Sequence, residues 1–134
     1  MRMKIEQKLL DQLSEEARNN PRLRTNYDLR TDHNDQSQRM LNALEPGTVV
    51  PVHRHRDTTE TLVVVRGRLR ELLYNDQGEL TDSFEMAAGG ECPVLQIEKG
   101  QWHSLECLES GTVIFEAKDG RYEPLSPEDI LETA

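Results

Sequence analysis

Cysteines, aromatic side chains and long hydrophobic runs are all scarce in this sequence. The two cysteines, Cys92 and Cys107, are too few for a disulfide-built fold and match no zinc-finger spacing, so we expect free thiols. The longest apolar run, residues 62–65, is far shorter than a membrane-spanning helix, which predicts no membrane partner. The first residues also lack the apolar stretch of a signal peptide, which favours a cytoplasmic protein.

Basic side chains are outnumbered as well. The chain has 16 lysines and arginines against 25 aspartates and glutamates, and its formal net charge is -9. Such a surface repels phosphate backbones, so we expect no nucleic-acid partner. Most arginines nevertheless lie between residues 18 and 70, and guanidinium groups make two-pronged contacts with carboxylates and phosphates. The sequence is therefore compatible with binding of a small anionic ligand. The alternative is that these arginines form a solvated face with scattered ion pairs.

The apolar residues that are present suffice for one thin core. Only 35% of the 134 residues are hydrophobic and 4% are aromatic, so leucine, valine and isoleucine must supply most of that core. A chain of this length is too short for two independent cores. We therefore expect one domain.

The N-terminal segment has the periodicity of an amphipathic helix. Apolar residues recur at every fourth position, with polar residues between them: Ile5, Leu9, Leu13 and Ala17. The turn around Pro21 ends this pattern. The following residues 22–38 are polar and aperiodic, which predicts irregular structure laid over the domain.

Short β-like runs separated by turn residues occupy most of the remaining chain. We predict strands over residues 39–44, 49–55, 61–65, 69–74, 80–86, 94–97, 103–108 and 112–117. About eight short strands without helices between them favour an all-β antiparallel sandwich or barrel. Near the end, Ser126 and Pro127 have the capping hydroxyl and the N1 proline of a short C-terminal helix, which we expect over residues 127–133.

Three of the four histidines fall within the predicted strands. His53 and His55 are two residues apart, so on a strand both imidazoles project to one face. The polar segment 56–59 lets the chain turn, so that Glu60 can open the next strand and face the same interior. His103 begins a later strand, just after another turn.

These four residues are a donor set that suits a divalent transition metal. Three neutral imidazoles and one carboxylate that converge in a β interior leave one or two coordination positions open for water, oxygen or substrate. The alternative is that the histidines are unrelated core or surface residues with ordinary hydrogen bonds. The spacing of the residues favours the metal site.

That spacing resembles a family motif. The first motif of the cupins is matched by five residues at the family's separations: Gly47, His53, His55, Glu60 and Gly67. The second cupin motif is kept in part, since Gly100 and His103 are present. Glu98 stands where the family usually has proline, and Cys107 where it often has asparagine. The resemblance implies one metal, iron, zinc, manganese or nickel, with these ligands: His53, His55, Glu60 and His103.

A closer resemblance covers about residues 20–123. Segments 21–27, 38–47, 53–55 and 66–69 look like the small single-domain cupins of the WbuC type, which are often encoded among bacterial surface-polysaccharide genes. The resemblance implies a jelly-roll barrel, and cupins commonly form homodimers. We therefore expect one domain made of three parts: an N-terminal helix in residues 1–20, a cupin β-barrel in 21–123, and a C-terminal tail with a short helix in 124–134.

Residues in these segments are candidates for contacts with a ligand. We expect four to bind substrate: Asn26, Arg39, Asn42 and Arg68. An arginine on a strand that lines the barrel would meet an anionic group of the ligand. The alternative for Arg39 is an edge-strand charge that discourages pairing between sheets.

Three interpretations of the function fit these predictions. The first is a metal-dependent cupin enzyme, a dioxygenase or an isomerase, acting on a small polar or anionic, sugar-like molecule in polysaccharide metabolism. No catalytic acid or base can be named, because Glu60 already serves as a ligand. The second is a binding or sensor module that holds such a molecule at the metal without turnover. A structural barrel with an adventitious metal is a third alternative.

Overall fold

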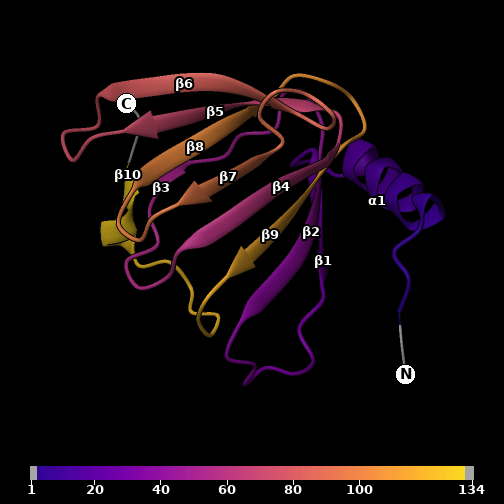
Figure 1. Cartoon of the computed structure of the whole chain (residues 1–134), viewed down its shortest axis with the longest axis horizontal. Helices are drawn as coiled ribbons and strands as arrows, with labels where there is room; N and C mark the ends of the chain where they lie inside the picture. Colours follow the sequence, from indigo (N-terminus) through magenta and orange to yellow (C-terminus); the bar gives the residue numbers. More distant parts are fainter. Residues whose placement is uncertain (1–2, 132–134) are drawn as a thin grey trace.

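The computed structural model describes residues 3–131, which form one α-helix, ten strands and one 3-10 helix (Figure 1). In chain order they are α1 (Gln7–Asn19), β1 (Arg24–Asp28), β2 (Gln38–Leu44), β3 (Val52–His53), β4 (Glu60–Arg66), β5 (Arg68–Tyr74), β6 (Leu80–Ala87), β7 (Val94–Ile97), β8 (Trp102–Cys107), β9 (Thr112–Lys118), η1 (Pro127–Asp129) and β10 (Ile130–Leu131). All eight predicted strands are present, with bounds close to those expected except for β3. Within the described residues, no helix is both long and apolar enough to cross a membrane.

The strands form two five-stranded sheets in which every pairing is antiparallel (Figure 1). The first sheet has the order β1-β2-β9-β4-β7, and the second has the order β10-β3-β8-β5-β6. The prediction of an antiparallel, mostly β fold is therefore confirmed. Between residues 3 and 131 no strand pairing joins one sheet to the other, so the sheets do not form the closed barrel that we expected.

An apolar core fills part of the space between the sheets. Side chains alternate along each strand, so every second residue points to this interior. The interior residues form what we call the core cluster: Leu44, Leu62, Val64, Leu69, Met86, Cys107 and Ile114. Full burial of such a side chain contributes about 1.5–3 kcal/mol. Aliphatic residues predominate, as the scarcity of aromatic residues predicted.

Helix α1 packs on part of the outer face of the first sheet, at β1 and β2 (Figure 1). Its buried apolar residues are Leu10, Leu13 and Ala17, and they pack on Leu41 and Ala43 of β2. The predicted amphipathic helix is thus present, and three residues of its predicted apolar stripe, Leu9, Leu13 and Ala17, belong to this contact. Because the helix begins at Gln7, Ile5 precedes it and is 43% exposed.

Part of segment 22–38 is a strand, which corrects the prediction of irregular structure. Strand β1 pairs along its whole length with β2, from Arg24 opposite Leu44 to Asp28 opposite Met40. It lies at the edge of the first sheet, and several of its side chains are polar. The strand therefore has no run of alternating apolar residues from which sequence analysis could identify it.

The prediction of a C-terminal helix over residues 127–133 is also corrected. Pro127 begins a single 3-10 turn that ends at Asp129, and residues 132 and 133 lie outside the described part of the chain. The chain then becomes strand β10, which pairs with β3 through Ile130 opposite His53. Pairing with β3 satisfies the backbone groups that a helix would have satisfied internally. The predicted strand 49–55 is shortened to the two residues of β3.

Candidate metal centre

A cavity of about 700 Å³ lies between the two sheets, beside the core cluster. Both sheets contribute to its wall, and the segment 120–125 and η1 lie at its edge. On β2 the even-numbered residues line the cavity, whereas Leu41 and Ala43 face α1. The period of two along the strand thus separates the residues of the cavity wall from the apolar pair that packs on the helix.

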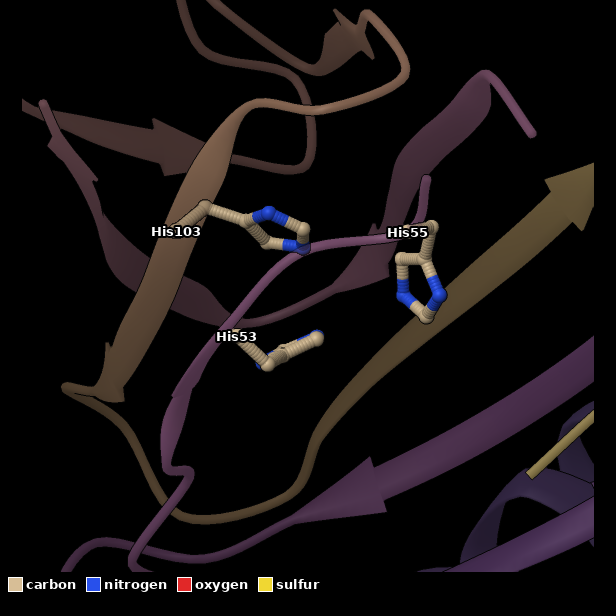
Figure 2. A group of neighbouring side chains, drawn as sticks. All are labelled: His53, His55 and His103. Atoms are coloured by element: carbon tan, nitrogen blue, oxygen red, sulfur yellow. The ribbon is translucent and has the colours of Figure 1, made fainter. Parts of the chain in front are cut away.

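Three histidines converge on this cavity, and Figure 2 shows their rings turned toward one another. One ligand atom from each of His53, His55 and His103 lies within 4.8 Å of those of the other two. His53 and His103 are brought together because they are paired across β3 and β8. The His53 and His103 ring centroids are 4.3 Å apart, and those of His53 and His55 are 5.1 Å apart.

Backbone carbonyl groups fix the orientation of two of these rings. Nδ1 of His53 lies 2.8 Å from the carbonyl oxygen of Pro51, and Nδ1 of His103 lies 2.9 Å from that of Gln101. A carbonyl oxygen only accepts, so each Nδ1 is the donor, and in the neutral imidazole the unprotonated nitrogen is Nε2. This is the arrangement by which proteins orient histidine ligands toward a metal.

Burial keeps the three imidazoles neutral. Desolvation, followed by the nearby His103, lowers the pKa of His53 to about 4. Desolvation and the neighbouring Lys118 lower the pKa of His55 to about 3. The pKa of His103 is lowered as well, mainly by burial. At neutral pH all three rings therefore have a free lone pair.

Glu60 lies next to the histidines but outside the compact group of three. Its Oε1 is 3.8 Å from His55 Nε2, and its Oε2 is 3.6 Å from His103 Nε2. Burial raises the pKa of Glu60, although Lys118 opposes this effect. The carboxylate is thus adjacent to the histidine nitrogens, and only 4% of the residue is exposed.

The donor set fits a divalent transition metal. Neutral imidazoles are typical ligands for zinc, iron, nickel and copper, whereas calcium and magnesium prefer sites built from oxygen atoms. Three imidazole nitrogens and an adjacent carboxylate also leave one or two positions open for another ligand in a five- or six-coordinate ion. The fixed orientation of the two anchored rings further suits this role.

Two charged residues of β9 face the same cavity and were not among the predicted site residues. Nζ of Lys118 lies 3.4 Å from Glu60 Oε1 and 3.6 Å from Glu116 Oε2. Burial raises the pKa of Glu116, and so does the neighbouring Glu60. Burial alone would lower the pKa of Lys118, but Glu116 and Glu60 outweigh this effect and raise it. The ammonium therefore keeps its charge and links the two carboxyl groups.

A third glutamate in the cavity wall has no such partner. Glu71 on β5 is 1% exposed, and no protein group hydrogen-bonds to either of its carboxyl oxygens. Desolvation, with a smaller contribution from Glu60 and Glu116, raises the pKa of Glu71 to about 9. On the facing sheet, the buried Oδ1 of Asn42 also lacks a protein partner.

The sequence carries a signal that marks these missed residues. Along β5, Glu71 occupies the same parity as Leu69 and Leu73, and along β9 Glu116 and Lys118 follow Ile114 at steps of two. A charged residue at an inward-facing position of a strand interrupts the apolar alternation. Such interruptions mark polar groups that the fold holds inside.

The four predicted substrate-binding residues divide into two pairs. Asn26 and Asn42 line the cavity. Arg39 is not in the lining: its guanidinium pairs with Asp35 at 2.7 Å. Arg68 is likewise outside the lining, 3.5 Å from Glu85. Both arginines occupy the parity opposite to the cavity-lining residues of their strands, which sequence alone could not assign.

Comparison with solved structures identifies the fold. KdgF from Halomonas sp. matches with a TM-score of 0.61 and 14% identity over 77% of this chain and 84% of that one. A variant of Bacillus subtilis oxalate decarboxylase, OxdC, matches with a TM-score of 0.55 and 18% identity over 73% of this chain. This match spans 24% of the decarboxylase chain. Both neighbours are cupin-fold proteins, so the predicted cupin fold is confirmed.

A family model gives the sequence relationship. The model described as Domain of unknown function (DUF6016) matches residues 5–86, a range that includes His53, His55 and Glu60 and ends before His103. No curated protein matches the chain. Because the family model covers more than half of the sequence, the protein belongs to the family described as Domain of unknown function (DUF6016), and it has the cupin fold.

Proposed function

We propose that this protein holds one divalent transition metal at His53, His55, His103 and Glu60 and binds a small polar molecule beside it. The observation that supports this most strongly is the convergence of three neutral imidazoles, two of them held by backbone carbonyls through Nδ1. The cavity of about 700 Å³ is large enough for a ligand of sugar size next to the metal.

The residues around the histidines have separate roles in this proposal. His53 and His103 present Nε2 because their Nδ1 protons are engaged, and Glu60 supplies the fourth ligand atom. Lys118 offers a cation to Glu60 in the absence of metal and to an anionic group of the ligand. A metal bound by these residues would supply Lewis-acid chemistry, or oxygen chemistry in the case of iron.

Both an enzyme and a non-catalytic binding module are compatible with this site. For the enzyme we propose dioxygenase or isomerase chemistry on a small polar or anionic, sugar-like molecule, with a role in bacterial polysaccharide metabolism. Asn26 and Asn42 are the predicted ligand-binding residues that line the cavity. We also propose that the protein is cytoplasmic and, from the resemblance to the cupins, that it is a homodimer.

Metal content is the experiment that tests this proposal. Protein purified without a histidine tag and without oxygen should contain about one iron, zinc, manganese or nickel per chain by inductively coupled plasma mass spectrometry. The His53→Ala/His55→Ala double variant should lose it. His33→Ala is the matched control, because His33 is exposed and lies outside the cavity lining. Equal, substoichiometric metal in all three proteins would refute the metal site.

Turnover separates the enzyme from the binding module. The metal-loaded protein would be incubated with monosaccharides and sugar acids, and products would be followed by mass spectrometry. Product formation that disappears in the double variant supports the enzyme. Thermal stabilisation by a compound that is never converted supports the binding module.

A further inference from the structure

Buried polar atoms without a protein partner are concentrated in the cavity. Across residues 3–131 there are four such atoms: Asn42 Oδ1, Glu71 Oε1, Glu71 Oε2 and Trp102 Nε1. Asn42 and Glu71 line the cavity, whereas Trp102 does not. Native proteins pair almost all of their buried polar groups, so two unmatched residues in one cavity call for an explanation.

The two residues lie on facing sheets, each two positions from a residue of the core cluster. On β5, Glu71 stands two residues from Leu69 of the core cluster, and on β2, Asn42 stands two residues from Leu44 of the same cluster. Two residues farther along β5, Leu73 is paired with His103. Glu71 therefore lies between the apolar core and the level of the histidines, at the inner end of the cavity.

The surroundings of Glu71 favour its neutral form. A carboxylate in this position would be buried without a counter-ion, which is among the most costly arrangements in a protein. The cation of the cavity interior, Lys118, is already held between Glu60 and Glu116. As a carboxylic acid, Glu71 offers one hydrogen-bond donor and one acceptor, while Asn42 Oδ1 offers an acceptor.

The ligand chemistry that satisfies both residues is that of hydroxyl groups. A hydroxyl donates one hydrogen bond and accepts others, so it can donate to Asn42 and accept from Glu71. A carboxylate has no hydrogen to donate to Asn42 Oδ1, and its partner in the cavity interior would be Lys118, which Glu60 and Glu116 already hold. We propose that Glu71 and Asn42 form a hydroxyl-recognition subsite and that the ligand beside the histidines is a polyhydroxylated compound of the sugar or polyol class. This inference rests on the proposed function, because it specifies the ligand of the same cavity.

The test compares two substitutions of Glu71 by thermal unfolding. Glu71→Gln keeps a neutral donor and acceptor of the same shape, whereas Glu71→Met keeps the volume and removes both. The probes are D-glucose, D-galactose, D-mannose and myo-inositol, with succinate as a carboxylate that has no hydroxyl group. Polyols stabilise any protein by exclusion from its surface, so the measured quantity is the difference between the shifts in Tm of the variants.

At least one hydroxylated probe should raise the Tm of the wild type and of Glu71→Gln by about 3 °C more than that of Glu71→Met. Equal shifts in all three proteins, a shift with succinate alone, or no shift with any probe would overturn the proposal. Should Glu71→Met fail to fold, Asn42→Ala takes its place, with the same expected loss.

Metal content measured on the same samples separates this inference from the proposed function. If the wild type contains no metal but the shifts in Tm of Glu71→Gln and Glu71→Met still differ, the metal centre is refuted and the subsite is supported. A Glu71→Met variant that loses the metal would place Glu71 at the metal and overturn the subsite. Full metal content with equal shifts in Tm would refute the subsite alone.

Discussion

Lys118 and Glu60 form an ion pair inside the cavity, with Nζ 3.4 Å from Oε1. The carboxyl group that we propose as the fourth metal ligand thus already has a cationic partner. A divalent ion at the histidines would compete with the ammonium for this carboxylate and would be repelled by its charge.

Removing the charge of Lys118 should therefore tighten metal binding. We expect Lys118→Met to lower the Kd for zinc by about tenfold, because a nearby like charge is lost in a poorly solvated site. The measurement is a competition titration against a chromophoric chelator. Lys118→Arg keeps the positive charge and should bind zinc as the wild type does. Unchanged or weaker binding by Lys118→Met would show that the ammonium does not oppose the metal.

Glu71 should make stability depend on pH. Its pKa is raised to about 9 from an ordinary value of 4.5, so between these values the folded state binds a proton that the unfolded state has released. The stability that Glu71 contributes is therefore complete below about pH 4.5 and is lost as the pH rises toward 9. The loss is at most about 1.4 kcal/mol per pH unit.

Glu71→Met removes this titration. Relative to the wild type, the variant should become more stable as the pH rises from 5 to about 9, as measured by urea unfolding of the metal-free proteins. Glu79→Met, a substitution of an exposed glutamate outside the cavity lining, is the control and should show no such trend. A stability difference independent of pH would mean that Glu71 is ionised in the folded protein.

The turn between β4 and β5 should not tolerate a side chain. Gly67 has a φ of +85°, and a Cβ added there would lie 2.3 Å from Thr112 Oγ1 and 2.7 Å from Thr112 Cα. Because Thr112 is fully buried, it cannot move aside. We expect Gly67→Ala to lower the free energy of unfolding by about 3 kcal/mol or more.

Gly111 provides the matched control for this substitution. It has a similar φ of +83°, but a Cβ there would meet nothing within 4 Å. Gly111→Ala should therefore cost only the backbone strain, about 1–2 kcal/mol. Equal costs at the two positions, measured by denaturant unfolding, would show that contact with Thr112 is unimportant.

Asp129 should hold β10 against β3. Its Oδ1 accepts hydrogen bonds from Arg54 Nε at 2.9 Å and Arg56 Nε at 2.7 Å, and these guanidinium groups lower the pKa of Asp129 to about 2. We expect Asp129→Asn to speed amide hydrogen exchange in peptides containing β3 and β10, with little change in Tm. Glu128→Gln is the control, because Glu128 is 79% exposed and contacts Arg56 only at 3.4 Å. Unchanged exchange in Asp129→Asn would show that backbone pairing alone holds the strand.

Spacing and strand periodicity predicted much of this molecule. From the two-residue step between His53 and His55 and the turn before Glu60, we predicted that these side chains face one interior. They do lie close together. These features are local in the sequence, although β3 ends at His53, so that His55 reaches the same interior from the segment after the strand. The predictions for the segment that contains β1 and for the end of the chain were wrong. Both segments pair at the edge of a sheet, and such pairing depends on partners elsewhere in the sequence, as with Ile130 opposite His53.

The face of a strand was harder to predict than the strand itself. Arg39 and Arg68 are on strands that bound the cavity, but their parity directs them away from its lining. A shift of one residue in the assumed register exchanges the two faces of a strand. In the sequence, Glu71 and Lys118 are marked only as charged residues that interrupt an apolar alternation, and their positions on facing walls of one cavity depend on the sheets to which β5 and β9 belong.

The position of β3 has a consequence for the order in which the protein assembles. His53 is paired with His103 on one side and with Ile130 on the other, so three distant parts of the sequence meet at one residue. Closing such long loops is slow, because their entropy must be lost before the contacts form. We therefore expect the histidines to come together late in folding, after the long hairpins of both sheets, so that a metal would be acquired by a nearly finished protein and would not guide its folding.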